Sequence, residues 1–224
     1  MKAIYDNYFR DYREHIRSAF SEPKQKKLLN KLLEAAHLYN VDEYKKAVEK
    51  LVRLKEKCKT PDEHCAVLFF LAMTYGEMGY LGSAIDAYKE LLAIDPSRST
   101  AWSNLGLLHR SKGEYAAAVK CFETAIEKKP DNGYAYANLG QAYYRMGEYE
   151  KGIAESKKAL SLQGGLYQAA NCICICAYIL GNLEESRKYF QLSITNGGNA
   201  DDLRAVLEEL KKSNYKKEDD FFDK

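Results

Sequence analysis

Apolar and small residues recur along the chain at intervals of three and four positions. One set with the spacing i, i+3, i+4 and i+7 consists of Trp102, Leu105, Gly106 and His109. A second set follows a few residues later and consists of Tyr115, Ala118, Phe122 and Ala125. This spacing brings side chains to one face of an α-helix. The pattern predicts two amphipathic helices that face each other.

The two-helix pattern repeats every 34 residues. Residues 99–132 align with residues 133–166, so that Trp102 matches Tyr136 and Leu105 matches Leu139. Further copies occupy the ranges 65–98 and 167–200, and a degenerate copy occupies 28–61. A fixed period of this length indicates stacked supersecondary units. We therefore expect about five helix–turn–helix units between residues 21 and 200.

Glycine and proline mark the ends of the helices in each unit. A glycine ends the first helix at Gly79, Gly113, Gly147 and Gly181, and the second helix runs to Pro96, Pro130 or the Gly164–Gly165 pair. Glycine permits the turn, and proline stops a helix. Small residues also recur where the two helices should cross: Ala35, Ala72, Gly106, Gly140 and Cys174 in the first helices, and Ala47, Ala84, Ala118, Gly152 and Ser186 in the second. Short side chains there allow a close approach of the backbones.

The motif Trp102-x-x-Leu105-Gly106-x-x-His109, followed by Ala118-x-x-x-Phe122 and Pro130, resembles the tetratricopeptide repeat (TPR). The resemblance implies an all-α fold, a right-handed α-solenoid of stacked helix–turn–helix repeats with terminal capping helices. His109 stands where the family usually has tyrosine, and we interpret it as a core residue.

The two ends of the chain differ from the repeats. Residues 1–20 place aromatic side chains on one face of an amphipathic helix, which either docks on the first repeat or contacts a second copy or a partner. Residues 201–212 predict a C-terminal capping helix, with Asp201 and Asp202 as its N-cap. Residues 213–224 form a charged tail that we expect to be flexible.

Charge and composition exclude several classes of partner. Lys and Arg number 34 against 32 Asp and Glu, so the net charge of +2 favours neither nucleic acid nor an anionic membrane. No run of 18 apolar residues occurs, and the first residues lack the apolar stretch of a signal peptide. Six cysteines without a disulfide framework fit a reducing compartment. We expect a cytoplasmic protein.

Motifs for catalysis or cofactor binding are absent from the sequence. It contains no phosphate-binding glycine loop, no His-Glu-x-x-His pair and no Gly-x-Ser-x-Gly elbow. Cys172, Cys174 and Cys176 alternate along one helix, and we interpret them as small buried thiols. We expect no enzymatic activity, no cofactor and no bound metal.

The resemblance implies a concave groove lined by the first helix of each repeat. The faces opposite the packing residues predict the following groove residues: Phe69, Met73, Asn104, Leu107, Arg110, Tyr134, Asn138, Gln141, Tyr144, Arg145, Asn171, Ile175 and Tyr178. Asn104 and Asn138 share one column and resemble the asparagine ladder with which some family members hold a peptide backbone; the alternative is that they bond only neighbouring backbone or water.

Arg110 and Arg145 share a second column, where they either clamp a carboxylate or phosphate or are merely solvated. The family's carboxylate clamp requires lysine at places where this chain has Ala66, Phe69, Thr100 and Tyr134, so we do not expect that clamp. We predict a non-catalytic adaptor that binds a peptide or protein segment in its groove. The alternative is a scaffold that self-assembles as a homo-oligomer through residues 1–20.

Overall fold

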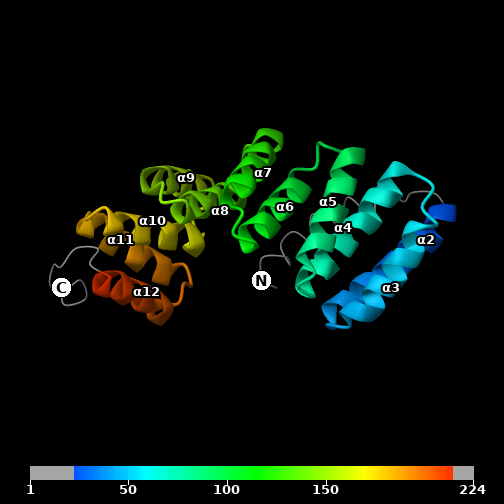
Figure 1. Ribbon diagram of the computed structural model, residues 1–224, viewed down its shortest axis with the longest axis horizontal. Coiled ribbons are helices and arrows are strands. Elements are labelled where there is room, and N and C mark those ends of the chain that lie inside the picture. The colour runs from blue at the N-terminus through cyan, green and yellow to red at the C-terminus, as the bar shows by residue number, and fades with distance from the viewer. Residues whose placement is uncertain (1–22, 214–224) are drawn as a thin grey trace. The chain divides into compact units, whose positions relative to one another are not determined.

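The computed structural model describes residues 23–213, with side chains from Leu28 onward (Figure 1). Within this range there are eleven helices and no strand, which confirms the predicted all-helical fold class. The predicted N-terminal helix 1–20 and nearly all of the predicted tail lie outside the described residues. The chain divides into two compact units, one that ends at Leu108 and one that begins at His109.

Unit 1 contains helices α2 (Pro23–Asn40), α3 (Tyr44–Lys55), α4 (Pro61–Glu77) and α5 (Leu81–Ile94), and it ends within α6 (Ser99–Ser111). Consecutive helices pack against each other from α2 to α5. Helix α4 is buried on every side from Cys65 to Thr74, because this stretch is apolar around its whole circumference.

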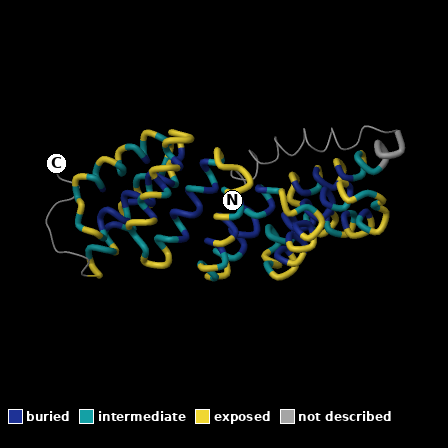
Figure 2. Tube along the Cα trace, turned by 90° about the horizontal axis from the view of Figure 1, so that it is seen from above, coloured by how far each residue is buried: buried dark blue, intermediate teal, exposed yellow. Residues whose placement is uncertain are grey.

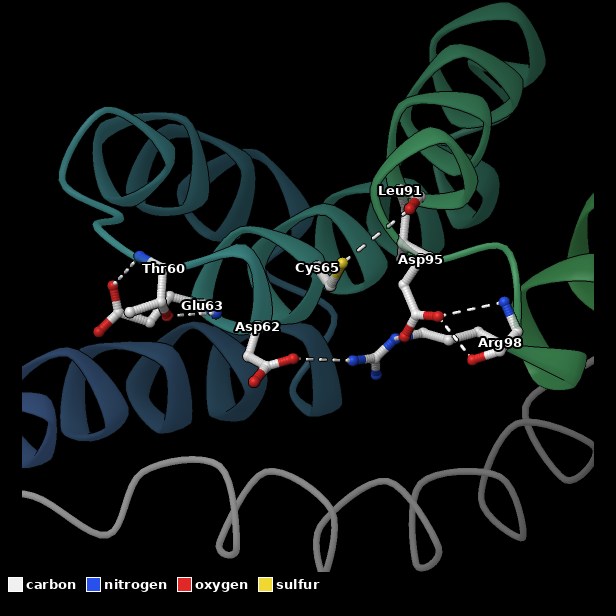
Figure 3. Close-up of polar contacts among 8 residues, drawn as sticks. Thr60, Asp62, Glu63, Cys65, Leu91, Asp95 and Arg98 are labelled. Carbon is white, nitrogen blue, oxygen red and sulfur yellow. Dashed lines mark hydrogen bonds and ion pairs between the residues drawn. The ribbon is translucent and has the colours of Figure 1, made fainter.

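Polar contacts fix the start of α4 and of α6 (Figure 3). Thr60 Oγ1 accepts a hydrogen bond from the backbone N–H of Glu63, and the Glu63 carboxylate accepts one from the backbone N–H of Thr60, a reciprocal capping box. Arg98 forms ion pairs with Asp95 at 2.7 Å and with Asp62 at 3.6 Å. The Arg98 side chain therefore ties the loop before α6 to the first turn of α4.

Unit 2 contains helices α7 (Tyr115–Lys128), α8 (Gly133–Arg145), α9 (Tyr149–Leu162), α10 (Tyr167–Ile179), α11 (Leu183–Thr195) and α12 (Ala200–Lys212). Consecutive helices pack against each other from α7 to α12, and α12 also contacts α10. In each unit the buried residues follow the sides on which the helices face one another (Figure 2).

The predicted glycine turns are confirmed. Gly79, Gly113, Gly147 and Gly181 all have φ between 77° and 79°, in the left-handed region that favours glycine. The residue after each glycine donates its N–H back to a carbonyl five positions earlier; the bond from Glu148 to Tyr143, for example, is 3.0 Å long. This arrangement ends the first helix of each pair and turns the chain directly into the second.

The close crossing of paired helices is confirmed at Gly140 in α8 and Gly152 in α9. A Cβ atom on Gly140 would lie 2.9 Å from the carbonyl oxygen of Gly152 and would overlap the Ser156 hydroxyl. A Cβ atom on Gly152 would lie 3.1 Å from the carbonyl oxygen of Gly140. The two backbones therefore approach so closely that α8 has no room for a side chain at Gly140, and a side chain at Gly152 would fit only tightly.

The C-terminal helix α12 covers the end of unit 2, but its predicted N-cap is wrong. The capping residue is Asn199, whose side-chain oxygen accepts hydrogen bonds from the backbone N–H groups of Asp201 and Asp202. The two aspartates occupy the first turn instead, where negative charge is favoured. Leu203 and Leu207 are buried against α10.

Candidate functional site

A hollow with a volume of about 400 Å³ opens on unit 2. Its walls come from the end of α6, the first residue of α7, and one face each of α8 and α10. The lining residues are Arg110, Ser111, Tyr115, Gln141, Tyr144, Arg145, Gln168, Asn171, Cys172 and Ile175. The volume lies within the range of ligand-binding clefts in proteins.

Helical spacing explains why these side chains meet. On α8 the lining residues Gln141, Tyr144 and Arg145 stand at positions i, i+3 and i+4. On α10 the lining residues follow the spacing i, i+3, i+4 and i+7 from Gln168 to Ile175. Both helices are the first members of their pairs, so the repeat places the same face of each toward the hollow.

Arg110 is held in place by two neutral amides. Its Nη1 atom donates hydrogen bonds to Asn138 Oδ1 at 3.1 Å and to Gln141 Oε1 at 2.6 Å. These bonds fix the orientation of the planar guanidinium group without neutralising its charge. Asn138 is almost fully buried, and its side-chain oxygen helps to hold the Arg110 guanidinium group in place.

Arg145 lies above the ring of Tyr144, with 5.5 Å between its guanidinium carbon and the ring centroid. A cation at this distance is attracted by the aromatic face. Tyr144 also packs against the ring of Tyr149, with centroids 6.3 Å apart. Burial raises the pKa of Tyr144, so its hydroxyl keeps its proton at neutral pH and can donate a hydrogen bond.

Two more amides stand on the α10 wall. The Asn171 side-chain oxygen accepts a hydrogen bond from the buried Ser193 hydroxyl. That bond orients the amide and leaves its nitrogen as a donor. Gln168 is half-buried on the same wall, one helical turn earlier. Side-chain amides of this kind both donate to and accept from a peptide backbone.

The structure brings six of the predicted groove residues to this one hollow: Arg110, Gln141, Tyr144, Arg145, Asn171 and Ile175. Three others of unit 2 do not line it. Asn138 supports Arg110, and Tyr134 packs on a cluster that includes Ala137 and Leu166. Tyr178 is 5% exposed, because it packs against Leu203 and Leu207 of α12.

The predicted groove residues of unit 1 lie in its interior. Phe69 and Met73 are buried within α4, where Phe69 packs edge-on against Tyr88 with centroids 5.8 Å apart. Asn104 is 1% exposed, and its amide nitrogen donates to the Tyr88 hydroxyl at 2.8 Å. Leu107 is also buried. We therefore do not include these four residues in the proposed site.

Four lining residues are not among the predicted groove residues: Ser111, Tyr115, Gln168 and Cys172. Tyr115 was assigned to helix packing, but as the first residue of α7 it stands at the rim. Cys172 is buried, as predicted for the three alternating thiols, yet it also contributes to the wall. His109 is only partly a core residue, since its ring nitrogen Nδ1 pairs with Glu114 at 2.6 Å.

No group of three or more His, Cys, Asp and Glu side chains in the described part of the chain is placed to hold a metal ion. None of the helices between residues 23 and 213 has the length and hydropathy that a membrane-crossing segment needs.

Three family profiles match the chain. A profile described as TPR repeat matches residues 106–147, and two described as tetratricopeptide repeat match residues 71–120 and 133–165. No curated protein matches the chain significantly.

Several solved structures are similar in fold. A crystal structure of MamA is 23% identical, with a TM-score of 0.66 over 76% of this chain and 96% of that one. PilF of Pseudomonas aeruginosa is 17% identical, with a TM-score of 0.69 over 86% and 94%. A tetratricopeptide repeat protein from Parabacteroides merdae is 19% identical, with a TM-score of 0.72 over 84% and 73%. At these identities the likeness concerns the fold alone.

Tetratricopeptide repeats generally form a non-catalytic fold for protein interaction, which makes the chain an adaptor or scaffold in the broad sense. The family profiles, together with the consecutive packing of helix pairs joined by left-handed glycine turns, show that this chain is a tetratricopeptide repeat protein.

Proposed function

We propose that the protein is an adaptor that binds a peptide or protein segment in the hollow of unit 2. The observation that carries this proposal is the gathering of polar and aromatic side chains from two first helices around one open volume of about 400 Å³. On a helix surface that contacts only water, nothing favours the gathering of tyrosine, isoleucine and three carboxamides on one concave patch. Such a mixture is typical of binding surfaces, where aromatic anchors supply contact area and polar groups fix orientation.

The carboxamides favour a polypeptide over a small molecule as the ligand. Gln168 and Asn171 stand one turn apart on α10, and Gln141 stands on the neighbouring α8. An extended peptide exposes N–H and C=O groups along its length, and each carboxamide pairs with either group. Tyr115, Tyr144 and Ile175 add apolar contact for one or two side chains of the segment.

The setting that we propose is a reducing compartment such as the cytoplasm. All six cysteines lie in the described part of the chain, and all are free thiols. Disulfides persist in oxidising compartments and are rare in reducing ones. The alternative of self-assembly through residues 1–20 concerns a segment outside the described residues, so the structure adds no support for it.

A peptide-display selection on the full chain tests the proposed function. The readout is the affinity of the selected peptides, measured by fluorescence anisotropy. In the variant Gln168→Trp, a bulky indole fills the hollow, and we expect at least a tenfold loss of affinity. The matched control is Lys158→Trp on α9, an exposed position that does not line the hollow and should leave affinity unchanged. Equal affinity in both variants would contradict the proposal.

A further inference from the structure

We propose that residues 1–20 lie as an amphipathic helix across the first helices of unit 1 and close this face to partner segments. The occupant is the chain's own N-terminal segment and not that of a second copy. This inference does not depend on the proposed function, because it concerns unit 1 and not the hollow of unit 2.

The first helices of unit 1 share an apolar strip on the face that aligns with the hollow of unit 2. Phe69 and Met73 of α4 are 1% and 3% exposed, and Leu107 of α6 is 8% exposed. Leu32 and Ala36 stand at the corresponding positions of α2 in the degenerate first copy, and they are 1% and 5% exposed. The strip therefore continues over three successive first helices and is buried on each of them.

The same face is open in unit 2. Gln141 of α8 and Ile175 of α10 align with Met73 and Leu107 in the 34-residue repeat, and both line the open hollow. Helices α4 and α8 have equivalent neighbours, since each packs against the second helix before it and the second helix after it. These neighbours leave the face of α8 open, so they do not explain why Met73 is buried. The burial of the strip requires a further element.

Residues 1–20 have the pattern and the length that this element needs. The apolar face of the predicted helix consists of Tyr5, Tyr8, Phe9, Tyr12, Ile16, Ala19 and Phe20. A helix from Tyr5 to Phe20 would be about 24 Å long. Helices pack about 8 to 10 Å apart, so three adjacent first helices span about 16 to 20 Å between their outer axes. The aromatic face is therefore long enough to cover the whole strip.

The point of attachment favours the chain's own segment over a second copy. Only Ser21 and Glu22 separate Phe20 from Pro23, the first residue of α2, and α2 itself carries part of the strip. A short tether gives an intramolecular contact an effective concentration in the millimolar range. The segment of a second copy at micromolar concentration competes poorly with a segment that is tethered in this way.

The proposed contact has a consequence for partner binding. A contiguous apolar strip in water is prone to association with other apolar surfaces. With residues 1–20 in place the strip is covered, and a partner segment enters unit 1 only if it displaces them. The segment thus acts as an internal competitor at unit 1.

Thiol accessibility in the full chain tests the inference. Met73→Cys places a thiol in the strip, and Ile175→Cys is the matched control at the aligned position in unit 2. Both chains are treated with iodoacetamide under native conditions, and peptide mass spectrometry gives the alkylation rate at the introduced thiol. We expect position 73 to react roughly tenfold or more slowly than position 175, because the segment must open before the reagent enters.

Charge substitutions in the segment separate its effect from that of the described helices. Phe9→Asp with Tyr12→Asp places two charges on the apolar face, and we expect alkylation of Met73→Cys to accelerate by roughly tenfold or more. Asn7→Asp with Ser18→Asp adds the same charge to the polar face and should leave this rate unchanged. Alkylation of Ile175→Cys should be the same in all backgrounds, which shows that unit 2 remains folded.

Three results would overturn the inference. Slow alkylation at position 73 in the Phe9→Asp, Tyr12→Asp background would show that the described helices bury the strip without the segment. Equal acceleration by the two pairs of substitutions would show a general charge effect. A dimer in light scattering, with alkylation at position 73 that accelerates on dilution, would assign the segment to a second copy. The peptide selection at the hollow of unit 2 tests the proposed function separately from all three.

Discussion

The substitution Gly140→Ala should destabilise unit 2, although alanine is the better helix former. The added Cβ atom would lie 2.9 Å from the carbonyl oxygen of Gly152, and it would overlap the Ser156 hydroxyl. The hydroxyl can rotate away, but the carbonyl belongs to the backbone of α9. Relief of the clash therefore requires α8 and α9 to separate.

Two opposing contributions determine how much Gly140→Ala changes the free energy of unfolding. Replacement of glycine by alanine inside a helix stabilises by about 0.8 to 1 kcal/mol. Overpacking that forces a backbone shift costs about 1 to 3 kcal/mol. We expect the steric term to be the larger one here because the obstructing atom is backbone, with a net loss of about 1 to 2 kcal/mol in the free energy of unfolding.

Urea denaturation followed by far-UV circular dichroism measures this loss. The matched control is Gly76→Ala in α4, where the new Cβ would meet only the Leu108 side chain at 3.6 Å, an ordinary contact. The control should gain up to about 1 kcal/mol. If Gly140→Ala is as stable as the parent chain while Gly76→Ala gains stability, then the close crossing of α8 and α9 is not a constraint.

Three further predictions concern the C-terminal cap and a buried thiol. Asn199→Ala removes the acceptor for two backbone N–H groups of α12 and should cost about 0.5 to 2 kcal/mol in thermal unfolding, whereas Asn199→Ser should retain most of the stability. Leu207 is 1% exposed, so Leu207→Ala should cost about 2 to 5 kcal/mol by urea denaturation; a loss below about 0.5 kcal/mol would show that α12 is not packed on unit 2. Burial raises the pKa of Cys174 from 9.0 to about 11, so its contribution to stability is complete below pH 9 and is lost as the pH rises through 11. Cys174→Ala should reduce the loss of melting temperature between pH 9 and 11, and an unchanged loss would contradict this assignment.

Features that follow from local chemistry were predictable from the sequence. The glycines at the turns and the small residues at the α8–α9 crossing are required by backbone geometry, and Gly147 and Gly140 illustrate the two cases. The N-cap of α12 was misplaced because Asn199 and the two aspartates after it are all good capping residues. A sequence cannot decide which of them adopts the non-helical conformation.

The candidate site was predictable only in part, because helical periodicity assigns faces but not exposure. The pattern placed Phe69 and Met73 on an open face, yet α4 is apolar on all sides from Cys65 to Thr74 and is buried along this stretch. The uniform hydrophobicity of this stretch was the signal in the sequence that could have predicted its burial. Tyr178 has the right register on α10, but α12 covers it. Which repeat face remains open depends on contacts between elements that no single helix encodes.

The central claim is that the hollow of unit 2 binds a polypeptide segment. NMR chemical-shift mapping of the labelled full chain against the tightest-binding peptide from the display selection tests it most directly. The account predicts that the largest changes occur at the side-chain amides of Gln141, Gln168 and Asn171, and that the amides on the far sides of α9 and α11 are unaffected. Changes concentrated in unit 1 or on α12, with the three carboxamides unperturbed, would contradict it.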